Sequence, residues 1–600
     1  MRRAIKVIFL SALWNLIRAI LQAHTRHVRV GRAKSAEFPQ NTGVPQGACS
    51  SPTLFALFFT ILTTEVAHAV RDNNVDASTP PDLASWPTLR RHPDGSLYVD
   101  YGVLSVLAYA DDAVLVAHNK HHAELCLQAC AKALHYIGSA INVAKTWHLV
   151  NATRGRPTPQ LHVYTVAAGQ LQRGPPIQQT QVLSKKTGNA YLGVALTANM
   201  SFREQRKTAL RKATAELRRS GAAICSHGVA HPRLGNILVH QAYSHLLFAS
   251  EVWADVTHTT VYNKLKSAAA AAAARSLDVR GHPNRDAVLG ELGIPSPDAR
   301  VYQQRLAYWF ELLLQPDTRP TRYVYNVSLA CMRGPGNDEW WRDTTRAAAD
   351  RIPNWARDTR HMLHTLGLDE AWAGGDPDGQ LAWLMDRAQR QAIDRRTMTD
   401  HVLYTRERDV VRNLAREIVT EWAAHAWHER MAANPRTATT AKIHRRPEYA
   451  RYLDARYNRD ALRIRTALRT GTYGLHDDPE AEECPLCHRP GPETVPHFML
   501  ECEALATARR RLGPRMREAA RTPALRALLN DEDTRADTEL ALALGGNLDH
   551  VPGLEDFNKP RSAAPADTVA SHPATDRLRA LRLSADVLVA MDSTRERLLQ

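Results

Sequence analysis

Two adjacent acidic residues, Asp111 and Asp112, are the first place where this sequence could do chemistry. Short, mostly apolar runs at 103–108 and 113–117 flank them, which predicts two buried strands joined by a tight hairpin. Paired carboxylates bind hard divalent cations, and Mg²⁺ also holds substrate phosphates. Two ions roughly 3.5–4 Å apart can hold the attacking and leaving oxygens of a phosphoryl transfer. An Asp pair is also common at turns without any ligand, so the pair alone leaves both interpretations open.

A second set of residues has the spacing of a metal site. Cys484, Cys487, His497 and Cys502 follow the pattern Cys-x2-Cys-x9-His-x4-Cys. Three thiolates and one imidazole complete a closed tetrahedral zinc site, which suits a structural role. His488 adjoins Cys487 in sequence, so both would struggle to reach one ion, and we choose His497. Free cysteines that cluster by chance are the alternative.

Cys126 and Cys130 lie one helical turn apart, within a segment of helical periodicity at 120–140. They lack histidine or further cysteine partners. We therefore interpret them as small core residues rather than ligands.

Several motifs surround the Asp pair. Gly-Val-Pro-Gln-Gly at 43–47 and Ser-Ser-Pro at 50–52 lie upstream, whereas Asn142, Lys145 and Thr146 and then Tyr-Leu-Gly at 191–193 lie downstream. In order and content they resemble the palm of reverse transcriptases, closest to those of non-LTR retrotransposons. Tyr-Ala-Asp-Asp at 109–112 is similar to the family's catalytic hairpin.

The resemblance implies RNA-directed DNA polymerisation, with an RNA template, a DNA primer or target, deoxynucleotide triphosphates and Mg²⁺. It also implies a role for each matching residue: Asp111 and Asp112 as catalytic residues and Mg²⁺ ligands, Gln46 and Gly47 at the nucleotide and template, Lys145 at the leaving pyrophosphate, and Leu192 and Gly193 at the primer. The Cys/His set resembles the zinc knuckle near the carboxyl end of non-LTR polyproteins. A nuclear, intracellular location is implied as well.

One family feature has no counterpart here. The family carries a first catalytic aspartate on a strand well before the glutamine-glycine loop, but Glu37 is the only acidic residue before Gly43. We expect the chain to begin inside the palm, without the fingers or that strand, and we do not expect Asp100 to replace the missing carboxylate. The sequence thus leaves two hypotheses: a reverse transcriptase fragment, or a catalytically inactive nucleic-acid-binding remnant that retains a basic thumb and the zinc knuckle.

Composition agrees with a nucleic-acid partner. The chain has 600 residues, a net charge of +15 and a pI near 9.5, which favour polyanions. A hydrophobic fraction of 44% is typical of a folded protein. Eight cysteines are too few for a disulfide framework in a chain this long.

The apolar spacing from Leu10 to Leu21 predicts an amphipathic helix rather than a signal peptide, and no stretch is long and apolar enough to span a bilayer.

Beyond the palm motifs the sequence indicates mostly helices. Arg203, Lys207 and Arg211 recur at spacing four, which predicts one basic helix face, either tracking a phosphate backbone or merely solvated. Four short segments resemble the region after the palm of non-LTR elements: 251–253, 289–293, 305–309 and 468–471.

The fold class we predict is α+β: a partial polymerase palm of antiparallel sheet with helices, then a mostly α-helical thumb and connector, and a small zinc knuckle. The expected domains are the palm at 1–198, a thumb-like helical region at 199–330, a helical connector at 331–480, the CCHC zinc knuckle at 481–505, and a charged helical or disordered tail at 506–600.

Overall fold

The computed structural model of the chain divides into two compact units. Unit 1 comprises residues 1–205, 315–327 and 346–353, and unit 2 comprises the remainder. The structure describes residues 25–26, 29–30, 33–36, 38–39, 51–75, 89–91, 97–99, 106–109, 112–117, 119–136, 138–150, 160–177, 179–182, 189–196, 202–226, 232–253, 259–317, 319–330, 355–391, 400–454, 458–476, 480–552, 554 and 573–600.

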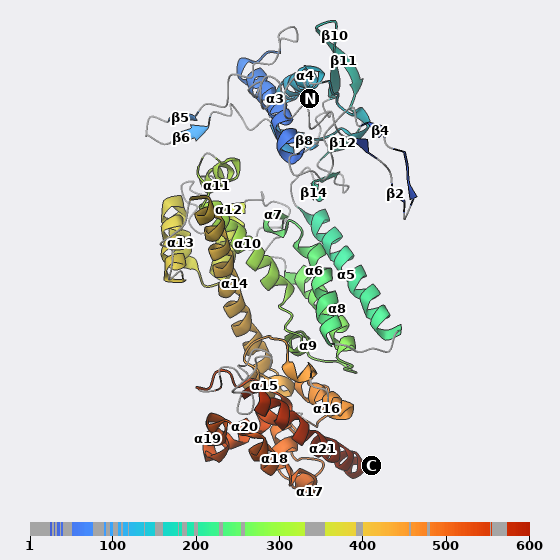
Figure 1. The fold of residues 1–600 in the computed structure, drawn as a ribbon, viewed down its shortest axis with the longest axis vertical. Coiled ribbons are helices and arrows are strands. Elements are labelled where there is room, and N and C mark those ends of the chain that lie inside the picture. Colours follow the sequence, from blue (N-terminus) through green and yellow to red (C-terminus); the bar gives the residue numbers. More distant parts are fainter. Residues whose placement is uncertain are drawn as a thin grey trace. The chain divides into compact units, whose positions relative to one another are not determined.

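Two helices form the centre of unit 1. Helix α3 (Ser51–Asp72) packs against α4 (Lys120–Tyr136) through a buried apolar cluster that includes Ile61, Val66, Cys126 and Ala129 (Figure 1). Lys132 Nζ of α4 lies 3.0 Å from Glu65 Oε2 of α3, and both side chains are largely buried. This ion pair fixes how the two helices are aligned, because each buried charge has its partner only in that arrangement.

Short two-stranded sheets lie beside these helices. The β7–β8 and β10–β11 pairs are antiparallel, and β9 pairs with β12 in parallel. The described strands are β1 (Thr25–Arg26), β2 (Arg29–Val30), β3 (Ala33–Lys34), β4 (Phe38–Pro39), β5 (Leu89–Arg91), β6 (Leu97–Val99), β7 (Val106–Tyr109), β8 (Asp112–Leu115), β9 (Trp147–Val150), β10 (His162–Ala167), β11 (Gln170–Pro176), β12 (Gln179–Val182), β13 (Asn189–Tyr191) and β14 (Val194–Leu196).

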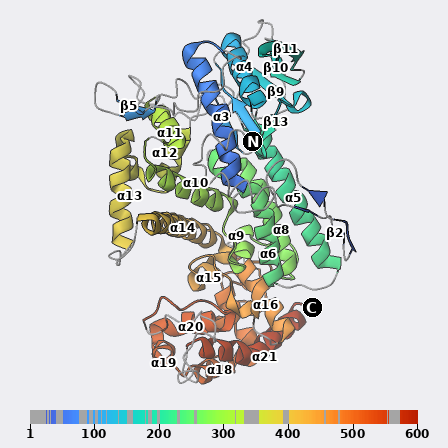
Figure 2. The same cartoon turned by 45° about the horizontal axis from the view of Figure 1, so that its top comes forward.

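The regular elements in the described part of unit 2 are helices, and α6 and α8 lie side by side in it (Figures 1 and 2). Its helices, two of which continue from unit 1, are α5 (Arg203–Ser226), α6 (Pro232–Leu247), α7 (Ser250–Trp253), α8 (Thr259–Ser276), α9 (Arg285–Glu291), α10 (Pro297–Leu313), α11 (Pro320–Ala330), α12 (Trp355–Thr365), η3 (Asp369–Gly375), α13 (Pro377–Gln391), α14 (Asp400–Ala432), α15 (Pro435–Ile443), η4 (Arg451–Asp454), α16 (Arg459–Thr470), η5 (His497–Glu501), η6 (Glu503–Leu505), α17 (Ala506–Arg509), α18 (Leu512–Ala519), α19 (Pro523–Asn530), α20 (Glu532–Leu544) and α21 (Pro573–Leu599).

Local sequence accounts for several of these helices. Helix α8 contains an unbroken run of alanines, and alanine has the highest intrinsic helix propensity of any residue type. Helix α16 begins where the Asn458 side chain accepts hydrogen bonds from the amides of Asp460 and Ala461. It ends at Gly471, whose φ of 72° is left-handed.

The segments at 289–293 and 468–471, far apart in the sequence, meet in the core of unit 2. Arg469 Nη2 lies 2.6 Å from Glu291 Oε1, and Arg469 Nε donates to the same oxygen at 2.8 Å. Both side chains are almost completely buried. The Arg469 guanidinium also lies 5.1 Å from the centre of the Tyr452 ring. The ion pair therefore joins α9 to α16.

The segments at 251–253 and 305–309 also meet in unit 2, through hydrogen bonds and a contact between Arg305 and an aromatic ring. Gln304 Nε2 donates to Glu251 Oε2 at 2.9 Å, and Trp355 Nε1 donates to the Glu251 carbonyl at 2.8 Å. Buried Arg305 stacks on the Trp355 ring at 4.7 Å and donates to the Trp355 carbonyl at 3.0 Å. These contacts join α7, α10 and the start of α12.

The carboxyl-terminal part of unit 2 has one continuous apolar core. It includes Ile464 of α16, Phe498 beside the cysteine cluster, Leu525 of α19 and Leu588 of α21. Asp576 of α21 accepts hydrogen bonds from the Arg521 and Thr522 amides at 2.9 and 2.7 Å. The Cys/His segment and the helices after it are therefore packed together.

The described residues are mostly helical with small, mainly antiparallel sheets, which agrees with the α+β class expected. Helix α3 carries Pro52 in its first turn, and α5 lies where the basic helix face was predicted. Cys126 and Cys130 are buried core residues, as predicted. The five domain boundaries stay predictions. None of the described helices combines the length and apolar character needed to cross a membrane.

Arg469→Met should destabilise unit 2, because it leaves the Glu291 carboxylate buried without a partner. Breaking a buried pair in this way costs about 3–5 kcal/mol. We expect a lower urea midpoint for unfolding followed by tryptophan fluorescence, to which Trp427 contributes from its position against Gly290.

Arg446→Met is the matched control. Arg446 Nε lies 3.4 Å from Glu448 Oε2, and this pair is at the surface. The control should leave the midpoint unchanged. The double variant Arg469→Met/Glu291→Leu should regain much of the loss, since no unpaired charge remains. An unchanged midpoint for Arg469→Met would contradict the role given to this pair.

Candidate catalytic hairpin and metal centre

The β7–β8 hairpin holds Asp112 beside its turn. Its register pairs Tyr109 with Asp112 and Val106 with Leu115. Asp112 is exposed, whereas Val106 and Leu115 pack on the core shared by α3 and α4. Asp111, and likewise Gln46, Gly47 and Asp100, lie outside the described residues. The hairpin expected from the sequence is therefore present, with one of its two carboxylates described and directed to the surface.

The turn at Leu192 and Gly193 joins β13 to β14 as a two-residue hairpin. Tyr191 pairs with Val194, and φ is positive at both turn residues, 48° at Leu192 and 79° at Gly193. Positive φ at both positions is characteristic of the type I′ turn, whose twist matches that of paired strands. Leucine adopts this region at a cost, which glycine avoids. Leu192 is exposed on the turn.

Tyr191 lies within electrostatic range of Asp112. Burial raises the pKa of the Tyr191 hydroxyl above its ordinary value, and the negative charge of Asp112 raises it further. The structure therefore brings the turn at 191–193 close to the β7–β8 hairpin within unit 1. Tyr191 belongs to the Tyr-Leu-Gly motif recognised in the sequence, and its electrostatic interaction with Asp112 is what the structure adds.

Lys145 projects from a short 3-10 turn, Val143–Lys145, which its neighbours stabilise. The Asn142 side chain accepts from the Lys145 amide at 3.3 Å, and Thr146 Oγ1 donates to the Asn142 carbonyl at 2.7 Å. Val143 packs on a cluster that also contacts Leu115 of β8. The Lys145 side chain is exposed. Asn142 and Thr146 thus hold the turn, which leaves the lysine available for a ligand.

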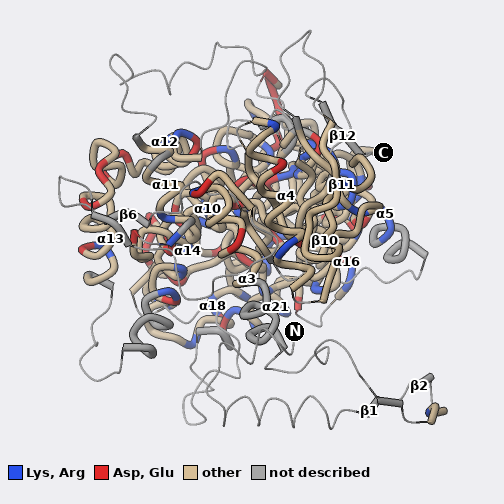
Figure 3. Tube along the Cα trace, turned by 90° about the horizontal axis from the view of Figure 1, so that it is seen from above, with Lys and Arg blue, Asp and Glu red and all other residues tan. Residues whose placement is uncertain are grey.

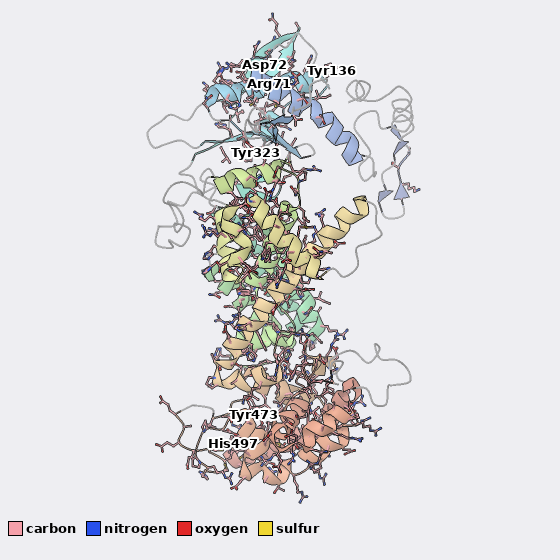
Figure 4. The ribbon with its side chains drawn as sticks, turned by 90° about the vertical axis from the view of Figure 1, so that its left-hand side faces the viewer. Arg71, Asp72, Tyr136, Tyr323, Tyr473 and His497 are labelled. Carbon is pink, nitrogen blue, oxygen red and sulfur yellow. The ribbon has the colours of Figure 1, made fainter. Side chains whose placement is uncertain are left out.

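The four predicted metal ligands come together in unit 2. The ligand atoms of Cys484, Cys487, His497 and Cys502 all lie within 4.8 Å of one another. Cys487 Sγ and His497 Nε2 are 3.4 Å apart. Figure 4 labels His497 in this helical region. The structure brings His497 rather than His488 into the cluster, and His488 Nδ1 instead faces Glu483 Oε1 at 3.3 Å.

Backbone geometry explains this convergence. A β-bridge between Glu483 and Pro490 closes the loop that carries Cys484 and Cys487. His497–Glu501 form a π-helical turn, in which the Cys502 amide donates to the His497 carbonyl at 2.7 Å. Residues five apart are separated by about 140° on an α-helix with 3.6 residues per turn, so the wider π turn is what brings His497 and Cys502 to the same side.

The electrostatics of the cluster fit a bound cation. Burial raises the pKa of the Cys502 thiol to about 12, with the neighbouring thiols adding to the effect. Burial also acts to raise the pKa of Cys487, but amide hydrogen bonds from Arg489 and Glu503 and bonds with the other thiols lower it overall. The three thiols cannot all ionise in a buried site without a compensating positive charge. A divalent metal supplies that charge, and Cys₃His is a donor set that zinc prefers.

Two further residues face this cluster, and sequence reasoning missed both. Glu501 Oε2 lies 3.7 Å from His497 Nδ1, beyond hydrogen-bond distance but near enough for the carboxylate to interact electrostatically with the imidazole. Arg509 Nη1 is buried and has no hydrogen-bond partner. Burial lowers the pKa of Arg509, and negative charge at Cys502 opposes that shift. Three thiolates around a divalent ion leave one excess negative charge, which this guanidinium can balance.

Comparison with known families agrees with the hairpin geometry. Residues 4–196, about a third of the chain, match the family model described as "Reverse transcriptase (RNA-dependent DNA polymerase)". No curated protein and no solved structure gives a significant match. Reverse transcriptases act on a nucleic-acid template and primer with nucleotide substrates, and they generally use a divalent metal.

His497→Ala should lose the bound metal, whereas His488→Ala should keep one ion per chain. The reason is that only the His497 imidazole reaches the cysteine cluster. The measurement is the metal content of the purified full-length chain by inductively coupled plasma mass spectrometry. Equal metal loss in both variants would contradict the ligand assignment.

Proposed function

We propose that residues 1–198 form the palm of a reverse transcriptase of the non-LTR retrotransposon type, which extends a DNA 3′ end on an RNA template. The observation that carries the proposal is the family match at 4–196. This segment contains the β7–β8 hairpin, which has Asp112 beside its turn. The motifs at 43–52, 109–112, 142–146 and 191–193 also occur in the family's order. Action on chromosomal target DNA would require a nuclear location.

In this proposal Asp111 and Asp112 bind Mg²⁺, which neutralises phosphate charge and aligns the reacting oxygens when it is bound. Asp112 is exposed beside a tight turn, which suits this role. Val106 and Leu115 of the same hairpin pack on the core of α3 and α4 and so limit the movement of Asp112. Gln46 and Gly47 contact the incoming nucleotide and the template. Leu192 and Gly193 hold the primer, and the electrostatic interaction between the adjacent Tyr191 and Asp112 supports this assignment.

Lys145 assists departure of pyrophosphate. Its ammonium group opposes the negative charge that develops on the leaving group as the bond to the incoming nucleotide breaks. The turn braced by Asn142 and Thr146 presents the lysine at the surface, where a nucleotide can reach it.

The Cys484, Cys487, His497 and Cys502 cluster holds a structural zinc ion in this proposal. A closed donor set leaves no open position for a substrate, so the ion stabilises the fold of the carboxyl-terminal region rather than taking part in polymerisation. Its place within the continuous apolar core supports this role.

Nucleic-acid binding without polymerisation is a second candidate, favoured by helix α5. Its buried stripe consists of Gln205, Ala209, Ala213 and Leu217, whereas its exposed residues include Lys207, Arg211, Lys212, Arg218 and Arg219. Figure 3 colours Lys and Arg blue and Asp and Glu red along the described chain, α5 included. A basic face of this kind can track a phosphate backbone.

Primer extension separates the two candidates. If 1–600 polymerises, it incorporates deoxynucleotides on a primed RNA template with Mg²⁺, and Asp111→Asn/Asp112→Asn abolishes incorporation because the amides no longer neutralise the cations. Such incorporation would mean that another carboxylate takes the place of the missing first aspartate. Template binding by gel shift should be unaffected by the double variant. Binding without incorporation by the unsubstituted chain would favour the second candidate.

Lys145→Ala should slow incorporation roughly a hundredfold, the usual effect of removing one preorganised group that stabilises transition-state charge. Single-turnover incorporation is the measurement. Lys120→Ala removes an exposed lysine of α4 that pairs with Glu124 at 3.8 Å, and it should leave the rate unchanged. Equal rates for Lys145→Ala and the unsubstituted chain would remove Lys145 from the mechanism.

A further inference from the structure

Unit 2 contains a cavity beside the metal centre that none of the assignments above uses. Its volume is about 210 Å³. Four separate segments line it: residues 281–282, 435–436, 468–475 and 494–495. The last of these ends two positions before the ligand His497. Figure 4 labels Tyr473, a cavity residue, and His497 in the same helical region.

Glycine conformations keep these segments close without filling the space. Gly471 has a φ of 72°, and a Cβ atom there would lie 2.9 Å from Arg436 Cβ. Gly281 and Gly474 also have positive φ, and a Cβ at either would meet nothing within 4 Å. The Asn284 amide donates to the Thr470 carbonyl at 3.2 Å, which ties the loop at 281–284 to the end of α16. The cavity is thus a built feature of the described backbone.

The lining combines an apolar wall with polar and cationic groups. Leu468, Leu475 and Val495 supply the apolar part, and Thr472 and Thr494 supply hydroxyl groups. Arg436 and His282 are exposed at the cavity, and none of its lining residues is acidic. Arg280 and Arg285 flank the same loop and are exposed as well. This combination suits a flat, uncharged ring with hydrogen-bonding edges that is attached to an anionic chain.

The volume limits the ligand to a small one. Pockets for drug-sized molecules measure about 300–1,000 Å³. A cavity smaller than that range accommodates a single ring system but not a base together with its sugar and phosphates, which must remain outside. Outside the cavity the phosphates would meet the exposed guanidinium of Arg436 and its basic neighbours.

We propose that this cavity binds one unpaired base of a single-stranded nucleic acid, with the adjacent phosphates held by Arg436 and the basic loop at 280–285. The inference rests on the proposed function only in that a reverse transcriptase handles single strands. It names a place in unit 2 where such a strand is held, separate from the β7–β8 hairpin.

The metal centre and the cavity are structurally coupled. Thr494 Oγ1 accepts a hydrogen bond from the His497 amide at 3.3 Å, and the Tyr473 ring lies 5.1 Å from that of Phe498 in the π turn. Metal binding therefore orders one wall of the cavity, which gives the closed metal site a part in strand binding without contact between ion and strand.

Photocrosslinking with the full-length chain tests the proposal. The RNA used is a twelve-residue oligouridylate with one central 4-thiouridine, and a matched oligothymidylate with 4-thiothymidine shows whether DNA binds at the same place. We expect the crosslinked peptides to map to one of the segments that line the cavity, 281–282, 435–436, 468–475 or 494–495. Crosslinks that map only to other segments, or no crosslink at all, would overturn the proposal.

Substitutions on one helix separate the cavity from general charge. Arg436→Gln, at the first turn of α15, should weaken RNA binding severalfold and reduce its salt dependence, because a phosphate contact is lost. Lys442→Gln removes the same charge from the exposed end of the same helix and should have a much smaller effect. Equal weakening by both variants would mean that only overall charge matters.

Filling the cavity tests the base directly. Thr472→Leu should reduce affinity roughly tenfold by occupying the space for the base, within the range found when single base contacts are removed. A thermal unfolding scan shows whether Thr472→Leu has a folding defect. If it has, the comparison of Arg436→Gln with Lys442→Gln decides whether the strand is held at the cavity. Asp111→Asn/Asp112→Asn should keep the crosslink while losing synthesis, so failure of the polymerase proposal and failure of this one give different results.

Discussion

The buried ion pair between Arg469 and Glu291 is the interaction on which the rest of unit 2 depends. A guanidinium and a carboxylate can be buried only if they meet, because each alone would keep a large desolvation penalty. The two residues lie on α16 and α9, so their pairing determines how these helices pack. Arg465, one turn earlier on α16, donates to the carbonyls of Ala543 and Leu581 at 2.6 and 2.8 Å. Helix α16 thereby connects α9 on one side with α20 and α21 on the other.

The same principle operates in unit 1 on a smaller scale. The Lys132–Glu65 pair aligns α4 with α3, and the apolar cluster between these helices supports β7 and β8. Leu115 of β8 and Val143 of the lysine turn contact one neighbouring cluster. The exposed groups proposed for catalysis, Asp112 and Lys145, are therefore attached to a shared hydrophobic base. Rigid support of this kind is what a site needs when its chemistry is positioning and charge stabilisation.

The carboxyl-terminal region links metal binding, packing and the proposed strand site. Phe498, between His497 and Cys502, is buried in the core that reaches α21, and it also contacts the Tyr473 ring at the cavity. Arg595 of α21 pairs with buried Glu493 at 2.7 Å, one residue before Thr494 of the cavity wall. A metal ion in the cluster would thus stabilise the core and the cavity together, since both use the same short segment.

The sequence by itself determined the features that depend on local spacing. The two apolar runs around Asp111 and Asp112 predicted the β7–β8 hairpin, and the spacing of the cysteines with His497 predicted a ligand cluster, because a turn or a short loop decides both geometries. The roles of Gln46, Gly47 and Asp111 stay predictions, since these residues lie outside the described part of the chain. Only the tertiary structure decided that Glu291 meets Arg469, that Tyr191 lies near Asp112, and that four distant segments enclose a cavity. The physical reason is that such contacts depend on the packing of whole helices, in which residues far apart in sequence become neighbours, and no local pattern encodes which of the many possible partners a buried charge will find.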